Sequence, residues 1–437
     1  MSIILGISGG LSHTGQDAAA TIIQDGKCVF AMEEERFIRT KHARGVMPTN
    51  SIREGLKYIN KTIKDVEFVS YYANYKNIRK DLEAYFKYYF DHSPEILFFD
   101  HHLCHAASTF YPSNFKKSLI FTADYSGDGI STTLSVGDGE NIKVIKKFSK
   151  PNSLGIFYSM FTQVLGFNYD DDEYKVMGLA PYGDPIYDLS KIIKSDNLGN
   201  YDLIKKFINL KSKSRQSPLF SQNLLKQLKL NKIFNSKNIS RKQKDLAASV
   251  QFTLENIVTN LLKDLFNKTK ISNLCLAGGV SLNCAMIKKI SDLKIFKNIF
   301  VQPASSDAGT SLGSAILACK IKNQKIKKFS SQAYLGNSFN NVEIKKVLDI
   351  CNLSYEHISK NHNKEFIIEK LKSNSIFAIF KGRHEFGPRA LGNRSIFANP
   401  KLTNMKSVLN NKIKFREGFR PFAPIILDKL ADKYFAS

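Results

Sequence analysis

MSIILGISGGLSHTGQDAAATIIQDGKCVFAM, residues 1–32, opens the chain with three short apolar runs. The runs at 3–7, 19–23 and 28–32 predict β-strands, and Asp25-Gly26 predicts a tight hairpin turn between the last two. Further patterns follow, with helices expected at 51–58 and 81–89 and buried strands at 68–72, 96–99 and 119–123. This alternation predicts an α/β domain.

A second alternation begins near residue 240. Ser240 followed by Gln243 predicts a capping box at the start of a long helix with one apolar stripe. Strands at 274–276 and 299–301 and a helix at 310–321 complete the second set. Two similar α/β units predict a duplicated architecture with a cleft between its halves, over residues 1–325. The polar, lysine-rich stretch 187–238 predicts an insertion with short helices, and a linker at 320–332 precedes a further domain at 333–437.

The composition limits the classes of function. A net charge of +25 on 437 residues favours nucleic-acid binding, but lysine spread by a Lys-, Asn- and Ile-rich composition explains it equally simply. We favour the second explanation, with small anionic ligands as partners. No apolar run approaches the ~20 residues of a membrane helix, and no basic signal-peptide region begins the chain. Six scattered cysteines without a C-x-x-C pair predict reduced thiols in a cytoplasm.

Two histidines and two aspartates follow the ends of predicted strands. His101 and His105 come directly after the strand at 96–99, and their spacing of four puts both imidazoles on one helix face. Asp124 ends the next strand, and Asp307 follows the strand at 299–301. Ligands gather at such strand ends, and two His with carboxylates suit Fe(II) or another divalent metal. The alternative is a pair of ordinary helix histidines.

Three glycine-containing segments are candidates for nucleotide binding. Residues 277–283, AGGVSLN, lie between a predicted strand and helix, where the backbone N–H groups of Gly278 and Gly279 can face a phosphate. Gly309 repeats the pattern at 307–313, and Lys175 and Gly178 lie in the segment 173–183. The alternatives are tight turns and, for Lys175, simple balance of the acids at 170–173.

The segment GRHEFGPRALGNRS, residues 382–395, combines three arginines with three glycines and a proline. Guanidinium groups bind phosphate or carboxylate in bidentate fashion, and glycine allows the backbone to come close to a ligand. The segment therefore predicts a site for a compact anion. The alternative is a surface turn whose arginines pair with local acids.

Polar residues after the first and third strands are candidates for the acceptor side of a reaction. His13, Asp17 and His42 could bind a hydroxylated acceptor or act as a general base. The charge run at 33–36 is expected to be a solvated helix start rather than a catalytic cluster.

Together these blocks resemble the NodU/CmcH family of O-carbamoyltransferases from end to end of the chain. The blocks that carry the resemblance are 34–37, 101–108, 153–155, 173–183, 276–283, 302–304, 307–309, 382–395 and 414–424. It implies a duplicated actin/Hsp70/sugar-kinase-like (ribonuclease H-like) domain followed by a YrdC-like α/β domain. It also implies that ATP, with Mg, and carbamoyl phosphate form carbamoyl-adenylate, from which a hydroxyl of a sugar-like or secondary-metabolite acceptor takes the carbamoyl group.

The resemblance also implies residue roles. His101, His105, Asp124 and Asp307 would hold Fe(II), and Gly278, Gly279 and Asn283 would hold the nucleotide. Arg389, Lys414 and Arg420 would hold carbamoyl phosphate. We expect no membrane partner for such an enzyme. A homodimer is a possible assembly.

Two features depart from the family pattern. Thr14-Gly15-Gln16 separate His13 from Asp17, where the family has His-Asp, and no Asn-Thr-Ser-Phe-Asn-type block follows Arg420. The C-terminal domain is therefore expected to be partial, with an adenylating site that is incomplete or is completed by another chain. The alternative functions are a tRNA threonylcarbamoyl-type transferase and a non-catalytic nucleotide-binding partner.

Overall fold

The computed structural model describes residues 2–10, 15–73, 75, 77–209, 217–236, 238–329, 333–359 and 361–435. The chain divides into two compact units. The first unit comprises Met1–Phe339 and Lys381–Asn393, and the second comprises Asn340–Phe380 and Arg394–Ser437. The domain boundaries expected from the sequence, 1–325 and 333–437, stay predictions.

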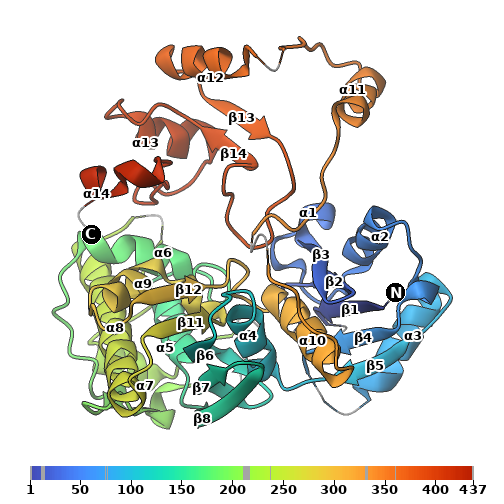
Figure 1. The fold of residues 1–437 in the computed structure, drawn as a ribbon. Helices are drawn as coiled ribbons and strands as arrows, with labels where there is room; N and C mark the ends of the chain where they lie inside the picture. The colour runs from blue at the N-terminus through green and yellow to red at the C-terminus, as the bar shows by residue number, and fades with distance from the viewer. Residues whose placement is uncertain are drawn as a thin grey trace. The chain divides into compact units, whose positions relative to one another are not determined.

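The first unit contains two five-stranded sheets with the same topology (Figure 1). One has the order β3-β2-β1-β4-β5, and the other has the order β8-β7-β6-β11-β12 when it is read from the β8 edge. In each sheet a three-stranded antiparallel meander is extended by two parallel strands. This repetition confirms the duplicated α/β class expected from the sequence.

The strands of the first sheet are β1 (Ile3–Ser8), β2 (Ala19–Gln24), β3 (Lys27–Glu33), β4 (Phe68–Tyr71) and β5 (Glu95–Phe98). Those of the second sheet are β6 (Lys117–Gly127), β7 (Ile130–Asp138), β8 (Asn141–Ser149), β11 (Asn273–Ala277) and β12 (Asn298–Val301). Every residue of β1 is buried because helices cover both faces of the sheet. Leu5 and Ile7 pack in the cluster formed with α2 (Thr49–Tyr58) and α3 (Ile78–Phe90), whereas Ile4 packs against α10 (Ala308–Ile321).

Two helices pack side by side between the sheets (Figure 1). α4 (His101–Phe110) follows β5 but packs on β6 and β11, whereas α10 follows β12 but packs on β1, β2 and β4. Gly313 permits the close approach, since a Cβ there would collide with the carbonyl oxygen of Cys104. This exchange of helices brings the beginnings of α4 and α10 together.

The long helix α8 (Arg241–Thr269) begins at the expected capping box, in which Ser240 and Gln243 bond to each other's backbone. α5 (Leu154–Val164), α6 (Glu173–Leu179) and α9 (Cys284–Ser291) belong to the same half. In the described part of the stretch expected to be an insertion, β9 (Ile193–Ser195) pairs with β10 (Tyr201–Leu203), and α7 (Gln222–Gln227) follows. The shorter helical elements are α1 (Glu35–Ile38), η1 (Lys41–Ala43), η2 (Ile63–Asp65), η3 (Ala180–Tyr182), η4 (Lys205–Phe207) and η5 (Gly279–Leu282).

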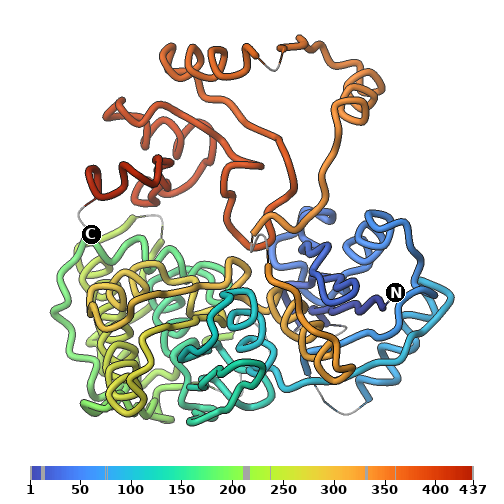
Figure 2. Tube along the Cα trace, in the orientation of Figure 1, coloured from blue at the N-terminus to red at the C-terminus, as the bar shows by residue number. Residues whose placement is uncertain are grey.

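The second unit is a small α/β unit, compatible with the expected YrdC-like domain. It contains α11 (Asn341–Ile350), α12 (Asn363–Lys372), β13 (Phe377–Phe380), β14 (Arg394–Phe397), α13 (Met405–Val408), a π-helix at Leu409–Ile413, η7 (Asp428–Leu430) and α14 (Ala431–Tyr434). β13 pairs antiparallel with β14, and no residue of α11 or α12 is buried. Between β13 and β14 the chain returns to the first unit, where residues 381–393 lie beside 333–337 (Figure 2).

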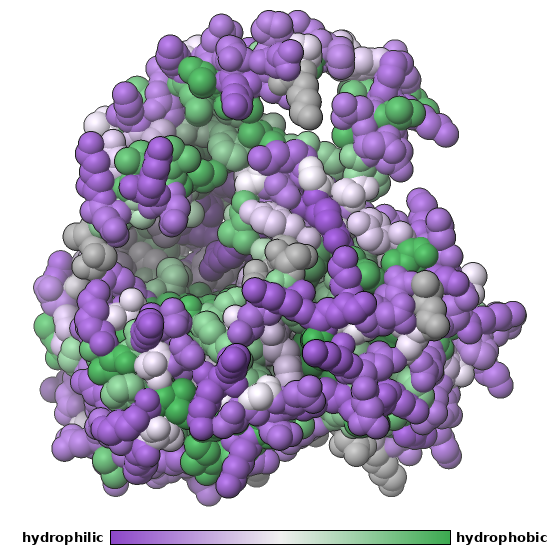
Figure 3. Space-filling model, in the orientation of Figure 1, coloured by the Kyte–Doolittle hydropathy of each residue, from purple (hydrophilic) through white to green (hydrophobic). Residues whose placement is uncertain are grey.

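Hydrophilic residues cover most of the face drawn in Figure 3, as a chain with 24% charged residues requires. Across the described residues, every helix is too short or too polar to span a bilayer.

Candidate functional site

The two histidines and two aspartates singled out in the sequence meet at one point of the first unit. His101 and His105 project from the first turns of α4, Asp124 lies near the end of β6, and Asp307 is the N-cap residue of α10. Their candidate ligand atoms all lie within 4.8 Å of one another. The exchange of α4 and α10 between the halves thus assembles one cluster from residues 206 positions apart (307 − 101).

The spacing of the cluster fits a divalent cation. His105 Nε2 lies 3.1 Å from His101 Nε2, 3.2 Å from Asp124 Oδ2 and 3.5 Å from Asp307 Oδ1. Four N/O donors at metal bonds of about 2.1 Å would stand roughly 3.4 Å apart in a tetrahedral arrangement. The buried Nδ1 of His105 has no hydrogen-bond partner among the described residues, so no described acceptor orients this imidazole from its far side.

The charges of the cluster also suit a cation. Burial alone would lower the pKa of His105, but hydrogen bonds and charge from Asp124 and Asp307 outweigh it and raise this pKa to about 9. Burial and the neighbouring charge of Asp124 raise the pKa of Asp307 to about 6. A divalent ion bound at this cluster would compete with these protons.

Two neighbours that were not among the predicted site residues shape the cluster. Gly127 is required because a Cβ at this position would collide with the His101 ring. Asp128 accepts a hydrogen bond from the backbone N–H of His101 at 3.1 Å, at the start of α4. The only sequence signal was the turn-like SGDG after β6, which is common in turns of every kind.

The glycine segment after β11 reaches the cluster. Gly278 has a φ of +87° and donates its N–H to the Ser305 carbonyl oxygen at 2.8 Å. A Cβ on Gly279 would have one atom within 4 Å, Asp124 Oδ1 at 3.1 Å, so the backbone there has open space beside the cluster. Gly309 instead packs against the carbonyl oxygen of Ala304.

The side chain of Asn283 is held inside the protein. Its Oδ1 accepts from Met286 N–H and caps α9, and its amide exchanges hydrogen bonds with Gln251. Lys175 lies in α6, 3.2 Å from Asp172, which agrees with the charge-balancing interpretation. Gly178 is half-buried in the same helix.

A second polar group contains two of the three acceptor-side candidates; the third, His13, lies outside the described residues. Asp17 Oδ1 lies 2.6 Å from His42 Nδ1, and Asp171 Oδ1 lies 3.3 Å from His42 Nε2. Arg44 joins this group through ion pairs at 3.1 Å with both Asp170 and Asp171. Sequence reasoning did not link the acidic run at 170–173 to His42, since 129 positions separate Asp171 from it (171 − 42).

The charge run at 33–36 corrects an expectation. Glu33 and Glu34 are 5% and 1% exposed rather than solvated. Glu34 accepts four hydrogen bonds from the backbone and side chains of Asn50 and Ser51, and so caps the start of α2. Glu33 accepts the N–H of Gly387 at 2.6 Å. The run was misjudged because its partners are distant in sequence.

The arginine-rich segment 382–395 splits between structural and free residues. Arg383 donates to the backbone carbonyls of Val29, Leu335 and Gly336, whereas Arg389 is exposed and pairs with no described residue. Lys414 is exposed in the second unit, where Arg420 lies 3.8 Å from Glu417. The structure thus presents Arg389 on one unit and Lys414 and Arg420 on the other.

The duplicated α/β unit carries a His₂Asp₂ cluster that could hold a metal ion, beside an open glycine turn. The family descriptions "Carbamoyltransferase N-terminus" and "Carbamoyltransferase C-terminus" match residues 74–316 and 368–437. The chain therefore belongs to the carbamoyltransferase family of transferases, which confirms the resemblance noted in the sequence.

The relatives extend over nearly the whole chain. Protein sll1178 of Synechocystis sp. is 33% identical over 98% of this chain and 76% of its own length. The nodulation protein NolNO of Sinorhizobium fredii is 33% identical over 99% of this chain and 67% of its own. Among solved structures, full-length HypF in its phosphate- and nucleotide-bound form is similar at a TM-score of 0.40 and 14% identity, over 74% of this chain and 56% of that one.

Proposed function

We propose that this chain is an ATP-dependent O-carbamoyltransferase. It would take the carbamoyl group of carbamoyl phosphate through carbamoyl-adenylate to a hydroxyl of a sugar-like or secondary-metabolite acceptor. Family membership supports carbamoyl transfer, and the His₂Asp₂ cluster beside Gly279 is the observation that carries the finer proposal.

The chemistry explains why an adenylate is useful. A carbamoyl carbon is a weak electrophile because its nitrogen donates electron density, so transfer needs a good leaving group. The acceptor oxygen would form a bond to this carbon while the bond from the carbon to the AMP phosphate oxygen breaks. AMP then leaves, and the hydroxyl proton passes to a base on the protein.

The pair formed by Asp17 and His42 is suited to take that proton. Asp17 is placed to accept the Nδ1–H of His42 at 2.6 Å, which leaves Nε2 as the basic nitrogen. Asp171 Oδ1, 3.3 Å from Nε2, marks a position that an acceptor hydroxyl could occupy instead. His13 is a third candidate for the acceptor side.

The nucleotide would lie along the glycine turn. The backbone at Gly279 is suited to a phosphate, whereas the N–H of Gly278 already donates to Ser305. Gly278, Lys175, Gly178, Asn283 and Gly309 are further candidates, and Mg would accompany ATP. His101, His105, Asp124 and Asp307 would hold the metal, for which Fe(II) is the proposed ion. Such an ion supplies Lewis-acid stabilisation of negative charge near the phosphate.

Arg389, Lys414 and Arg420 are proposed to bind carbamoyl phosphate. Arg389 supports this role best, because its guanidinium is exposed and has no described partner to give up. Its planar fork suits a phosphate better than a point charge would.

Pyrophosphate release tests the proposal directly. The protein should release pyrophosphate from ATP only when carbamoyl phosphate is present, and an acceptor should then gain the mass of one carbamoyl group. Pyrophosphate formation without carbamoyl transfer would support the adenylation step of the proposal and contradict transfer to the acceptor. Neither product, with Fe(II) and Mg supplied, would favour the non-catalytic nucleotide-binding alternative.

A tRNA threonylcarbamoyl-type reaction remains the second candidate because of the net charge of +25. It requires tRNA affinity that falls steeply as salt rises, since phosphate contacts release counterions. Weak tRNA binding whose affinity does not fall with salt would contradict the tRNA-modifying alternative.

A further inference from the structure

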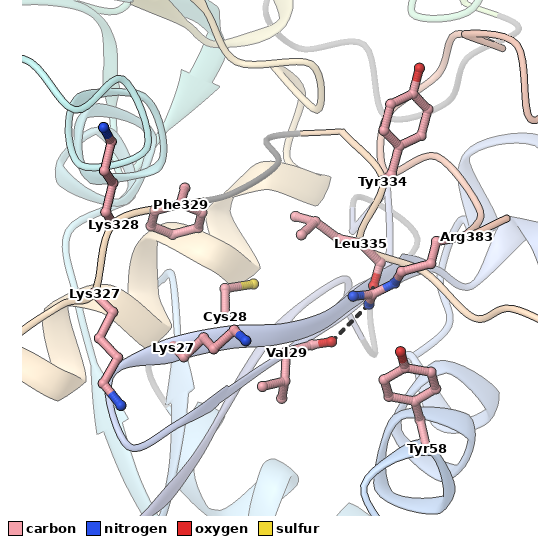
Figure 4. Close-up of a pocket in the computed structure, with 10 residues that line it drawn as sticks. All are labelled: Lys27, Cys28, Val29, Tyr58, Lys327, Lys328, Phe329, Tyr334, Leu335 and Arg383. Carbon is pink, nitrogen blue, oxygen red and sulfur yellow. Dashed lines mark hydrogen bonds between the residues drawn. The ribbon is translucent and has the colours of Figure 1, made fainter.

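A small cavity lies in the first unit, and none of its residues belongs to the His₂Asp₂ cluster (Figure 4). Its volume is about 200 Å³. The walls come from the start of β3, the end of α2, the residues after α10 and the segment 381–393, which returns from the second unit to the first. The lining residues are Lys27, Cys28, Val29, Tyr58, Lys327, Lys328, Phe329, Tyr334, Leu335 and Arg383.

The walls of this cavity are tied together by the backbone. Lys327 N–H donates to the Gly26 carbonyl at 2.8 Å, and Ala31 N–H donates to the Leu335 carbonyl at 3.0 Å. Lys327 and Leu335 are therefore each hydrogen-bonded to the hairpin or strand that includes β3, the edge strand of the first sheet. The cavity is thus largely preformed, which lowers the ordering cost of binding.

The lining is strongly positive. It contains three lysines and one arginine but no Asp or Glu. Lys27, Lys327 and Lys328 form no ion pair with a described residue and are exposed. In Figure 4 Lys327 and Lys328 lie at one end with their ammonium groups pointing in opposite directions, Arg383 stands at the other end, and Lys27 and Cys28 lie between them. A concave space lined by basic residues without acids concentrates anions nearby.

Arg383 is held rigidly and without a counter-ion. Its Nε donates to Gly336 O at 2.9 Å and its Nη2 donates to Val29 O at 2.7 Å and to Leu335 O. The guanidinium also lies over the Tyr58 ring, 5.0 Å from its centroid. Its partners are neutral carbonyls, so its positive charge is not cancelled, and Nη1 makes no hydrogen bond to a described residue. Nη1 can therefore donate to an anion.

We propose that this cavity is a binding site for a phosphoryl anion. The group is a free phosphate, carbamoyl phosphate or the phosphate of a nucleotide, held between the fixed guanidinium and the flexible lysines. The volume is below the roughly 300–1,000 Å³ of sites for drug-sized ligands, so a small anion suits it. A bound anion would link β3, Lys327, Lys328 and Arg383, and so stabilise the docking of residues 381–393 on the first unit. This site does not depend on the reaction proposed for the cluster.

Lysine acetylation read by mass spectrometry tests the site in the intact protein. The rates at Lys27 and Lys327 are compared in inorganic phosphate and in chloride of equal ionic strength. At phosphate ten times its Kd these rates should fall about tenfold by mass action. Lys80 and Lys87, exposed on α3 and remote from the lining, serve as the matched control and should not change.

The same acetylation experiment is repeated with carbamoyl phosphate and with AMP in place of inorganic phosphate. The natural ligand should protect Lys27 and Lys327 at the lowest concentration. If chloride slows acetylation of Lys27 and Lys327 as much as phosphate does, or if phosphate slows acetylation of Lys80 and Lys87 equally, the effect is charge screening only. Either result would overturn the proposal.

Arg383→Lys keeps the charge and removes the planar fork. It should raise the phosphate concentration needed to protect Lys27 by about tenfold or more, a loss of at least one charge-assisted hydrogen bond. If this variant does not fold, Lys327→Gln gives the same readout at Lys27. Unchanged protection of Lys27 in the folded variant contradicts the site. Because no carbamoyl transfer is measured, failure here is separate from failure of the proposed function.

Discussion

At the residue scale, the same side chain type serves different purposes according to its neighbours. In the cluster, hydrogen bonds from both histidines overcome burial and hold the pKa of Asp124 well below its usual range. Asp307, in the same cluster, has its pKa raised to about 6 by burial and by the charge of Asp124. A cluster with one firmly ionised carboxylate and one readily protonated carboxylate is suited to exchange a proton for a cation.

Replacing His101 and His105 together with Ala should abolish stoichiometric metal binding, because two of four donors are lost. Elemental analysis after anaerobic loading with Fe(II) measures this. His362→Ala, an exposed histidine of the second unit, is the matched control and should keep the wild-type metal content. Unchanged metal content in the double variant would contradict the ligand set.

Arg389→Ala should weaken carbamoyl phosphate binding by about 1.5–3 kcal/mol if the guanidinium makes a charge-assisted hydrogen bond. Calorimetry of carbamoyl phosphate binding gives the value. Folding should be unaffected, since Arg389 is exposed and has no described partner. Equal affinity of variant and wild type would remove Arg389 from the site.

Glu173→Gln should change the pH dependence of stability. Burial raises the native pKa of Glu173, although Ser159 O–H and Asp170 N–H donate to it. A raised native pKa gives a contribution that is complete below the unfolded pKa and is lost as pH rises through the native pKa. The free energy of unfolding of the variant should therefore rise relative to that of the wild type as pH increases above about 4.5, the ordinary pKa of a glutamate in an unfolded chain.

Urea unfolding across this pH range provides the measurement for Glu173→Gln. The exposed residue Glu140 is the control, and Glu140→Gln should leave the shape of the pH profile unchanged. A difference between Glu173→Gln and wild type that does not depend on pH would show that this carboxylate is not the cause.

At the element scale, the two middle helices carry the site. α4 and α10 each follow the last strand of one half and pack on the sheet of the other, so their N-terminal ends converge. The first turn of a helix is a natural place for ligand groups because its backbone N–H groups are free. The start of α2 instead takes its hydrogen-bond acceptor from a residue distant in sequence, Glu34.

The N-terminus of α2 provides a test of this requirement. Glu34→Ala would leave the N–H groups of Asn50 and Ser51 without their acceptor, and should lower the free energy of unfolding by roughly 3 kcal/mol. Urea denaturation measures the loss. Glu83→Ala, exposed on α3, should stay within about 0.5 kcal/mol of wild type. A loss for Glu34→Ala no larger than this control value would mean that water replaces the cap.

At the scale of the whole molecule, the chain passes between its two units three times. The last two passages enclose residues 381–393, which leave β13, dock on the first unit and return to β14. Gly387 anchors this stretch, since its N–H bonds to Glu33 and its carbonyl oxygen accepts from Arg36 at 2.7 Å. The stretch also carries Arg389, so its docking positions the residue that is proposed to bind carbamoyl phosphate.

Gly387→Ala should release the stretch. Gly387 has a φ of +123°, and a Cβ there would lie 2.5 Å from the Pro303 carbonyl oxygen. Gly392→Ala is the matched control, because its φ of +108° gives similar backbone strain but its Cβ would meet no atom within 4 Å. Trypsin should cut after Arg389 several-fold faster in Gly387→Ala than in the control. Equal cleavage rates would mean that backbone strain alone, and not the collision, loosens the stretch.

Much of the fold followed from local patterns. The expected strands in the first hundred residues agree with β1 to β5 within two residues, and the box at Ser240 and Gln243 begins α8 as expected. β7 and β8 were not predicted, since β8 mixes three lysines with its apolar residues and has neither a continuous apolar run nor a regular alternation. The family resemblance was confirmed, and the roles proposed for individual site residues stay predictions.

Local order along the chain was enough to predict strands, helices and the adjacency of His101 and His105, because hydrogen bonding and apolar periodicity act over a few residues. It could also indicate that Asp124 and Asp307 follow strand ends. The link between His42 and Asp171, the burial of Glu33 and Glu34 and the cationic cavity at Arg383 arose only in the tertiary structure. These features join residues far apart in sequence, and burial and electrostatics depend on distance in space, which packing alone determines.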